Sequence, residues 1–144
     1  MQLTPEQLQN LAKCTVKCSD IYAIRMNETM GITPKGNDKD RLKYFIVLGI
    51  DDNNNVFGGV VINSSIDKVP KHLQQWNIPL QCYRYSFLKK DSYVNCQKIK
   101  VVPIEKFYQW TKLGNIDKTD IDIITKTLQS SPLETKENLK RFGL

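Results

Sequence analysis

The chain has 144 residues, with 40% hydrophobic and 25% charged side chains, a balance that fits one globular domain and excludes an intrinsically disordered chain. Its 21 lysine and arginine residues outnumber 15 acidic ones, and the resulting net charge of +6 favours a polyanionic partner. No apolar run has the length of a membrane span or a secretion signal, so we expect no membrane association and a cytoplasmic location.

Residues 1–18 predict a short amphipathic helix. Thr4, Pro5 and Gln7 supply an N-cap, a first-turn proline and the partner of a capping box. The alternating segment SDIYAIRM, residues 19–26, then predicts the first strand.

The polar segment 27–41 predicts a long loop, because it contains Gly31, Pro34 and Gly36 and has no apolar periodicity. Loops of this length are uncommon inside compact domains and are often functional. The loop is therefore either a substrate flap that carries Lys35 or a solvated connection.

The strongest structural signal is a β-hairpin. KYFIVLGI (43–50) and VFGGVVIN (56–63) are rich in β-branched and aromatic residues, and DDNNN between them is a turn sequence. Gly58 and Gly59 in the second segment predict a bulge or sharp bend, by which a small sheet curls toward a barrel.

Further strands follow in the second half of the chain. Residues 66–79 predict a connection with a helical turn near its end, and the alternation of LQCYRYSFL (80–88) and SYVNCQKIKVV (92–102) predicts two strands. PIEKFYQW (103–110) predicts a turn or short helix, and TKLGNI (111–116) a last short strand.

Two helices are predicted to close the chain. Asp117 can cap the first of them. Ser131, Pro132 and Glu134 form a second capping box, which predicts a terminal helix within residues 131–144. We therefore expect one mainly β domain of the α+β class over residues 1–144, with a small antiparallel barrel between terminal helices.

Four segments, in this order, resemble motifs of the MazF/PemK family, the ribonuclease toxins of toxin–antitoxin pairs. SDIYAI resembles the opening GDI strand, KYFIVLGI the strand after an arginine–proline motif, and GGVVINSS the strand that ends in a PITS-like tripeptide. FLKKDSYVNCQKIKVVPIEKF resembles the stretch from an alanine–aspartate–glutamine motif to the helix. The likeness covers residues 19–130 and implies an SH3-like barrel with a C-terminal helix.

The resemblance also implies a function. It predicts a metal-independent endoribonuclease that cuts single-stranded RNA, needs no cofactor, forms a homodimer and is inhibited by a small antitoxin. In place of the arginine before proline, this chain has Arg41 and then Lys43, so either cation can fill that position. In place of the threonine or serine after the strand isoleucine it has Asn63, and the motif aspartate corresponds to Asp91.

The catalytic candidates are two cations and two hydrogen-bonding side chains: Arg41, Lys43, Asn63 and Ser64. Residues 43 and 63 are nearly equidistant from Asn54 in the turn, so hairpin geometry predicts that they face each other across the strands. A cation and several donors there would stabilise the charge that develops on a phosphate during attack by the 2′-hydroxyl. The alternative is that the polar residues after the strand only bond their own backbone and end it.

The substrate-binding candidates are basic or polar residues of the neighbouring loops: Lys35, Ser65, Lys89, Lys90 and Asp91. Lys98 and Lys100 can extend an RNA path on which tyrosines 83, 85 and 93 are stacking surfaces, although lysines on strands also protect sheet edges. His72, the only histidine, is expected to be a solvated loop residue.

The four cysteines are expected to be reduced and to hold no metal, because only Cys14 and Cys18 form a short pair. Two other functions remain open. The chain could be a non-catalytic module of the same fold that binds RNA or protein, or a structural or phage-encoded interaction protein.

Overall fold

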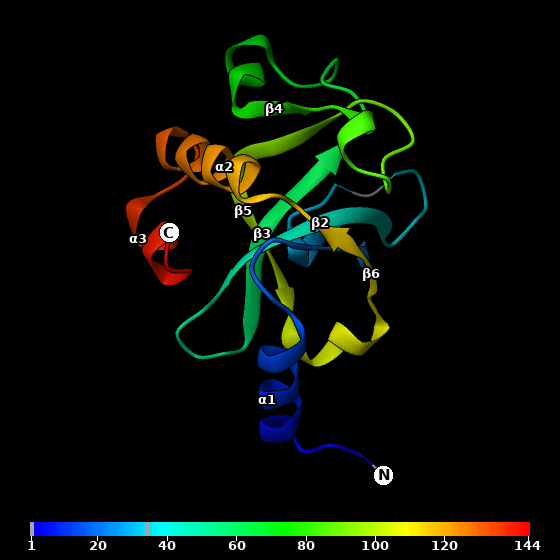
Figure 1. The fold of residues 1–144 in the computed structure, drawn as a ribbon, viewed down its shortest axis with the longest axis vertical. Coiled ribbons are helices and arrows are strands. Elements are labelled where there is room, and N and C mark those ends of the chain that lie inside the picture. Colours follow the sequence, from blue (N-terminus) through cyan, green and yellow to red (C-terminus); the bar gives the residue numbers. More distant parts are fainter. Residues whose placement is uncertain (1, 34) are drawn as a thin grey trace.

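A computed structural model describes residues 2–33 and 35–144, so Pro34 of the predicted flap lies outside the described residues. The chain forms a six-stranded antiparallel sheet with helices at both ends of the sequence (Figure 1), which confirms the α+β class. No helix in the described ranges is long and apolar enough to cross a membrane.

The first helix, α1 (Pro5–Thr15), begins where the sequence predicted. The Thr4 hydroxyl accepts a hydrogen bond from the backbone N–H of Gln7 at 3.1 Å, and the Gln7 side chain accepts one from the Thr4 N–H at 2.9 Å. This reciprocal pair is the predicted capping box. The helix extends away from the sheet (Figure 1), and its buried residue Ala12 and partly buried Leu8 pack against one face of the fold.

The six strands form one sheet in the order β4-β5-β3-β2-β1-β6. Their bounds are β1 (Asp20–Met26), β2 (Arg41–Ile50), β3 (Val56–Asn63), β4 (Asn77–Leu80), β5 (Ser92–Pro103) and β6 (Thr111–Asn115). Short 3₁₀ helices connect them: η1 (Glu28–Met30), η2 (Lys71–Trp76), η3 (Cys82–Arg84) and η4 (Ile104–Gln109). Within the described residues the sheet is open, with β4 and β6 as its two edges, and it is not closed into a barrel.

The β2–β3 hairpin is present as predicted, and its bulge places the extra residue, Leu48, in β2 opposite the two glycines of β3. A Cβ atom on Gly59 would lie 1.9 Å from the carbonyl oxygen of Ile46, so only glycine fits there. Asp51 closes the turn by accepting bonds from the N–H groups of Asn55 and Val56, at 2.8 and 3.2 Å.

Hydrophobic clusters cover both faces of the sheet. One cluster joins alternate residues of the central strands, such as Ile46 and Val94, to the two C-terminal helices, α2 (Lys118–Ser130) and α3 (Lys136–Arg141). The other joins the remaining alternate residues, such as Phe45 and Val61, to α1, η1 and η4. Because both faces are covered, consecutive residues in the middle of β2 and β3 are buried, whichever face of the sheet their side chains lie on.

Two sequence predictions in the second half are wrong. The strand predicted at residues 80–88 is replaced by the earlier, shorter β4 and by η3, because Arg84 and Tyr85 bind Asp120 at the start of α2. A tertiary polar network therefore overrides the local alternation.

The terminal helix begins later than predicted. Ser131 ends α2 instead of capping a new helix, and the Glu134 carboxylate accepts the backbone N–H of Ile99 at 2.7 Å. The N-cap of α3 is Thr135, whose hydroxyl accepts the N–H of Asn138. Glu134 thus connects the C-terminal segment to the sheet, a role that a capping-box pattern does not reveal.

Candidate functional site

Four strand ends meet at one end of the sheet. The last residue of β1, Met26, pairs with Arg41 at the start of β2, and the last residue of β3, Asn63, pairs with Tyr93 near the start of β5. The loop with Lys89 and Lys90 enters β5 at the same end. The antiparallel register therefore gathers segments that are far apart in the sequence.

The predicted cross-strand contact between Lys43 and Asn63 is present. The Nζ of Lys43 donates a hydrogen bond to Oδ1 of Asn63 at 2.6 Å, and both side chains are partly buried. Because Oδ1 accepts this bond, the amide nitrogen of Asn63 is left as a donor, and it has no hydrogen-bond partner in the described part of the chain.

Three further cations surround Lys43. Burial, together with the charges of Arg41, Lys35 and Lys100, lowers the pKa of Lys43 from 10.5 to about 8. Lys100 reaches this place from β5, and its Nζ donates to the carbonyl oxygen of Gly31 in the loop after β1 at 2.9 Å. Burial also lowers the pKa of Lys100. We call these four residues the basic cluster: Lys35, Arg41, Lys43 and Lys100.

The basic cluster lacks a compensating carboxylate among the described residues. Asp40, next to Arg41 in the sequence, is bound to Arg25 at 2.6 Å, and none of the recorded ion pairs includes a member of the cluster. Four like charges without a counter-ion favour the binding of an anion. A guanidinium and ammonium groups beside a free amide donor suit the oxygens of a phosphate.

Two of the predicted site residues, Ser65 and Asp91, form hydrogen bonds within the surrounding loops. The Ser65 hydroxyl accepts the backbone N–H of Asp67 at 3.1 Å, which is the local turn that the alternative interpretation predicted. Asp91 accepts the N–H of Cys82 at 2.9 Å, and this bond holds the pKa of the Asp91 carboxyl below its usual range. Ser64 is exposed and joins no recorded hydrogen bond of the described chain.

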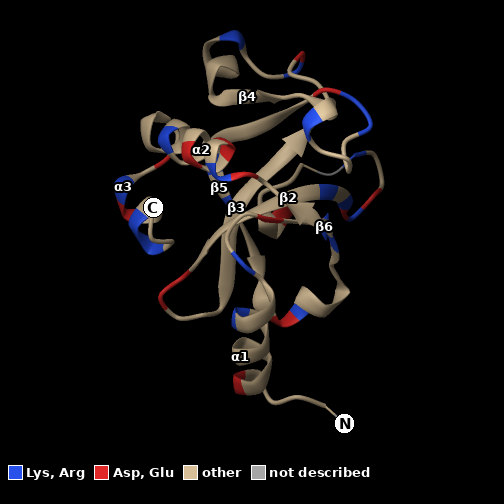
Figure 2. Ribbon diagram, viewed as in Figure 1, with Lys and Arg blue, Asp and Glu red and all other residues tan. Residues whose placement is uncertain are grey.

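Basic residues continue beyond the cluster. Lys89 and Lys90 are exposed in the loop between β4 and β5, close to the site end of the sheet. Figure 2 shows basic segments at the start of β2 and in this loop. His72 is exposed on η2, as expected.

The bulge in β5 separates two lysines that the alternation pattern placed together. The register of β5 against β3 shifts between the Val61–Asn95 pair and the Gly59–Lys100 pair, so residues 96–99 do not pair regularly with β3. Lys100 lies in the basic cluster, whereas Lys98 lines a cavity of about 450 Å³ against α3. Tyr85, proposed as a stacking surface, is buried instead.

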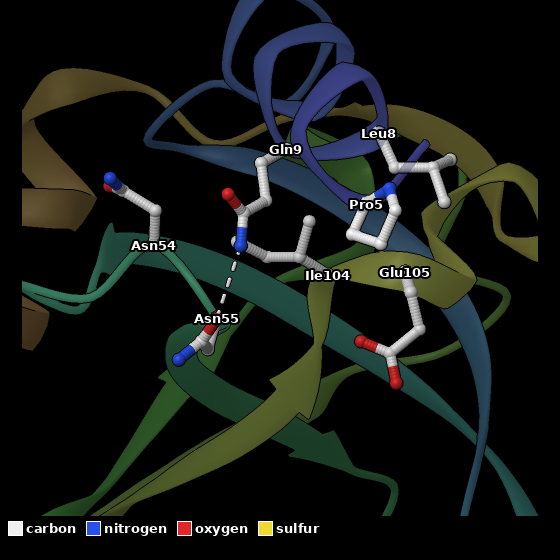
Figure 3. Close-up of a pocket in the computed structure, with 7 residues that line it drawn as sticks. All are labelled: Pro5, Leu8, Gln9, Asn54, Asn55, Ile104 and Glu105. Carbon is white, nitrogen blue, oxygen red and sulfur yellow. Dashed lines mark hydrogen bonds between the residues drawn. The ribbon is translucent and has the colours of Figure 1, made fainter. Parts of the chain in front are cut away.

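Cavities elsewhere do not include the basic cluster. One cavity, of about 280 Å³, lies between α1, the β2–β3 turn and η4. There the Gln9 side chain donates a hydrogen bond to Oδ1 of Asn55 at 3.1 Å (Figure 3). Another, of about 510 Å³, is an apolar hollow between α1 and η4.

No group of three histidine, cysteine or carboxylate side chains in the described residues could hold a metal ion. A comparison with protein-family models and one with curated proteins find no match to this chain.

Proposed function

We propose that this protein is a metal-independent endoribonuclease of the MazF/PemK type, built on a divergent, partly opened form of the SH3-like barrel, which cleaves single-stranded RNA at the basic cluster. The observation that supports this proposal most is the 2.6 Å bond between Lys43 and Asn63 within a group of four cations. It matches the chemistry that an RNA-cleaving site needs, and it coincides with the motifs that resemble the family.

The proposed reaction is attack of a 2′-hydroxyl on the adjacent phosphorus: the 2′-hydroxyl gives up its proton to water, the bond to the 5′-oxygen breaks, and the products are a cyclic phosphate and a free 5′-hydroxyl. Arg41 binds the non-bridging oxygens of the phosphate, and the free amide nitrogen of Asn63 donates a further hydrogen bond to them. Lys43, whose pKa is about 8, transfers a proton to the leaving 5′-oxygen more readily than an ordinary lysine.

Substrate binding and regulation follow from the charge and the family resemblance. Exposed Lys89 and Lys90 extend the positive surface along the incoming strand. We expect the active form to be a cytoplasmic homodimer, and a small antitoxin with an acidic segment would compete with RNA for the basic cluster.

The test is incubation of the purified protein with single-stranded RNA in EDTA, followed by analysis of the product ends. Cyclic phosphate products should form with the wild type and fall at least about a hundredfold with Lys43→Ala or Arg41→Ala. Lys126→Ala, on the exposed face of α2, is the matched control and should cleave normally. Unchanged cleavage in both cluster variants would reject the site.

Lys43→Arg separates two roles of the lysine. An arginine keeps the positive charge but does not give up a proton in the working pH range. Retained cleavage would indicate a purely electrostatic role, whereas retained RNA binding with lost cleavage would indicate proton transfer.

A second function is supported by one specific observation. No carboxylate of the described residues forms an ion pair with the basic cluster, so no general base is evident beside the amine. A module that binds RNA without cutting it needs only the charges. Salt-sensitive binding with no cleavage products in EDTA or with Mg²⁺ would favour this module.

A further inference from the structure

A row of side chains crosses the sheet on the face of the basic cluster. Lys43 of β2 is bound to Asn63 of β3, Asn63 pairs with Tyr93 of β5, and Tyr93 pairs with Pro79 of β4. Paired residues of antiparallel strands point to the same face. We call these four residues the cross-sheet row: Lys43, Asn63, Tyr93 and Pro79.

Tyr93 differs from the tyrosines that stabilise the fold. Tyr44 and Tyr85 each pack against the ring of Phe87, and Tyr85 also binds Asp120. Tyr93 is partly exposed, belongs to neither hydrophobic cluster and has no recorded aromatic or hydroxyl partner among the described side chains. The fold therefore leaves the ring of Tyr93 without an internal role.

The end of the row is open to solvent. Pro79 is exposed, and β4 is an edge strand with no further neighbour among the described residues. Proline has no N–H, so this position does not invite another strand to pair with the edge. A flat group stacked on Tyr93 would therefore lie beside this unpaired edge of the sheet.

We infer that Tyr93 is a stacking platform for one base of a single-stranded RNA whose backbone phosphate lies at the basic cluster. This inference rests on the RNA binding of the proposed function and adds the position of a base. Lys43 and Tyr93 are two strand spacings apart, about 10 Å. A positive groove with an aromatic ring beside it is the common device for holding an unpaired strand.

The same geometry selects single strands over duplexes. A ring can stack only on a base whose face is exposed, and the bases of a duplex are stacked on each other. The basic cluster alone would attract either form through its charge. Tyr93 therefore supplies the discrimination, and the cluster supplies the electrostatic attraction.

The test uses a six-nucleotide RNA with 2′-O-methyl groups, which cannot be cleaved, and with the fluorescent base 2-aminopurine at one position in turn. Binding to the wild type should quench the fluorescence at one position, because the base stacks on an aromatic ring. Tyr93→Leu should abolish that quenching and weaken binding about tenfold, while Tyr93→Phe should keep both. Circular dichroism and the melting temperature establish that each variant is folded.

Tyr108→Leu is the matched control. Tyr108 is 67% exposed on η4, at the opposite end of β5, so its loss should change neither quenching nor affinity. A duplex of the same sequence should bind the wild type and Tyr93→Leu equally. Equal binding of the single strand to wild type and Tyr93→Leu, or quenching that survives in Tyr93→Leu, would overturn the inference.

The outcomes distinguish this inference from the proposed cleavage. If the uncleavable RNA is quenched through Tyr93 but ordinary RNA stays intact in EDTA, the stacking platform stands and the nuclease is rejected. If RNA is cut but Tyr93→Leu binds and cuts normally, the nuclease stands and the platform is rejected. Absence of any RNA binding rejects both.

Discussion

The ammonium group of Lys43 lies 2.6 Å from the side-chain oxygen of Asn63, a neutral acceptor where an ion pair would normally be found. An asparagine fixes the direction of the lysine without cancelling its charge. The positive charge of the basic cluster is therefore retained at the surface, available to a ligand.

Replacing Asn63 by aspartate should neutralise part of the positive charge of the basic cluster. The Asn63→Asp side chain has nearly the same shape but carries a negative charge, so it would pair with Lys43 and raise the pKa of the amine. We expect the melting temperature to stay equal or rise, while RNA affinity falls and its salt dependence decreases by about one charge. Filter binding at several salt concentrations measures both quantities.

The control for this prediction is Asn63→Ala, which removes the acceptor without adding charge. It should lower RNA affinity less than Asn63→Asp does, because the cluster keeps all four positive charges. Wild-type affinity in Asn63→Asp would contradict the assignment of Lys43 to the phosphate site.

RNA binding should depend on pH around the pKa of Lys43. Burial and its cationic neighbours lower that pKa from 10.5 to about 8, so the amine loses its charge between pH 7 and 9, where an ordinary lysine stays charged. Affinity should therefore fall several-fold over this range. In Lys43→Arg the charge persists, and the affinity should be nearly constant.

The lowered pKa of Lys43 should also make the stability of the protein increase with pH over part of the alkaline range. Between pH 8 and 10.5 the unfolded chain holds a proton on Lys43 that the folded chain has lost, so the contribution of Lys43 to the free energy of unfolding rises with pH there. Below pH 8 Lys43 is protonated in both the folded and the unfolded chain, so the cost of burying its charge among other cations is then fully present. Urea unfolding of wild type and Lys43→Met at pH 7 and 9.5 should show a smaller difference at the higher pH.

Gly59→Ala should destabilise the protein strongly. The added Cβ would lie 1.9 Å from the backbone oxygen of Ile46 and 2.7 Å from the ring of Phe45, in the middle of the sheet. Overpacking of this kind costs about 3 kcal/mol or more. Gly36→Ala is a useful comparison, because the space around Gly36 is open. Only the positive φ of this residue disfavours alanine, which should cost about 1 kcal/mol of stability.

Glu134→Ala should loosen the C-terminal segment. Its carboxylate accepts the N–H of Ile99 in the irregular part of β5 and also a bond from the Asn138 side chain. Loss of the acceptor leaves these donors without partners, at a cost of about 2 kcal/mol. Glu134→Gln keeps an acceptor oxygen and should lose much less in chemical denaturation. Equal losses in the two variants would show that the bond to Ile99 contributes little.

The central hairpin could be predicted from the sequence, and so could the contact made by Lys43. Both follow from local rules: dense β-branched residues, a turn sequence, and nearly equal distances from Asn54. The bulge at Leu48 shifts the register by one residue, from the Gly49–Gly58 pair to the Val47–Gly59 pair, and this shift places Lys43 opposite Asn63 rather than Ser64. The α1 capping box is local in the same sense.

The wrong predictions have non-local causes. Tyr85 alternates correctly for a strand, but its hydroxyl binds Asp120, 35 residues away in sequence. Lys100 joins the basic cluster only because the β5 bulge shifts it relative to Lys98. Glu134 fits a capping-box pattern, yet its carboxylate accepts a hydrogen bond from the backbone N–H of Ile99 in β5. Each outcome depends on a contact between distant segments, which no local periodicity encodes.

The two apolar layers, one on each side of the sheet, imply an order in which the backbone exchanges its amide hydrogens. β2, β3 and β5 are covered from both sides, whereas β6 is a largely exposed edge and α1 buries little of its surface. Amide exchange measures local opening, so α1 and β6 should exchange through small fluctuations and the three central strands only through global unfolding. The amide groups of Ile46 and Val60, in the buried middle of the central strands, would then report on the slowest part of the molecule, and those of α1 and β6 on the fastest.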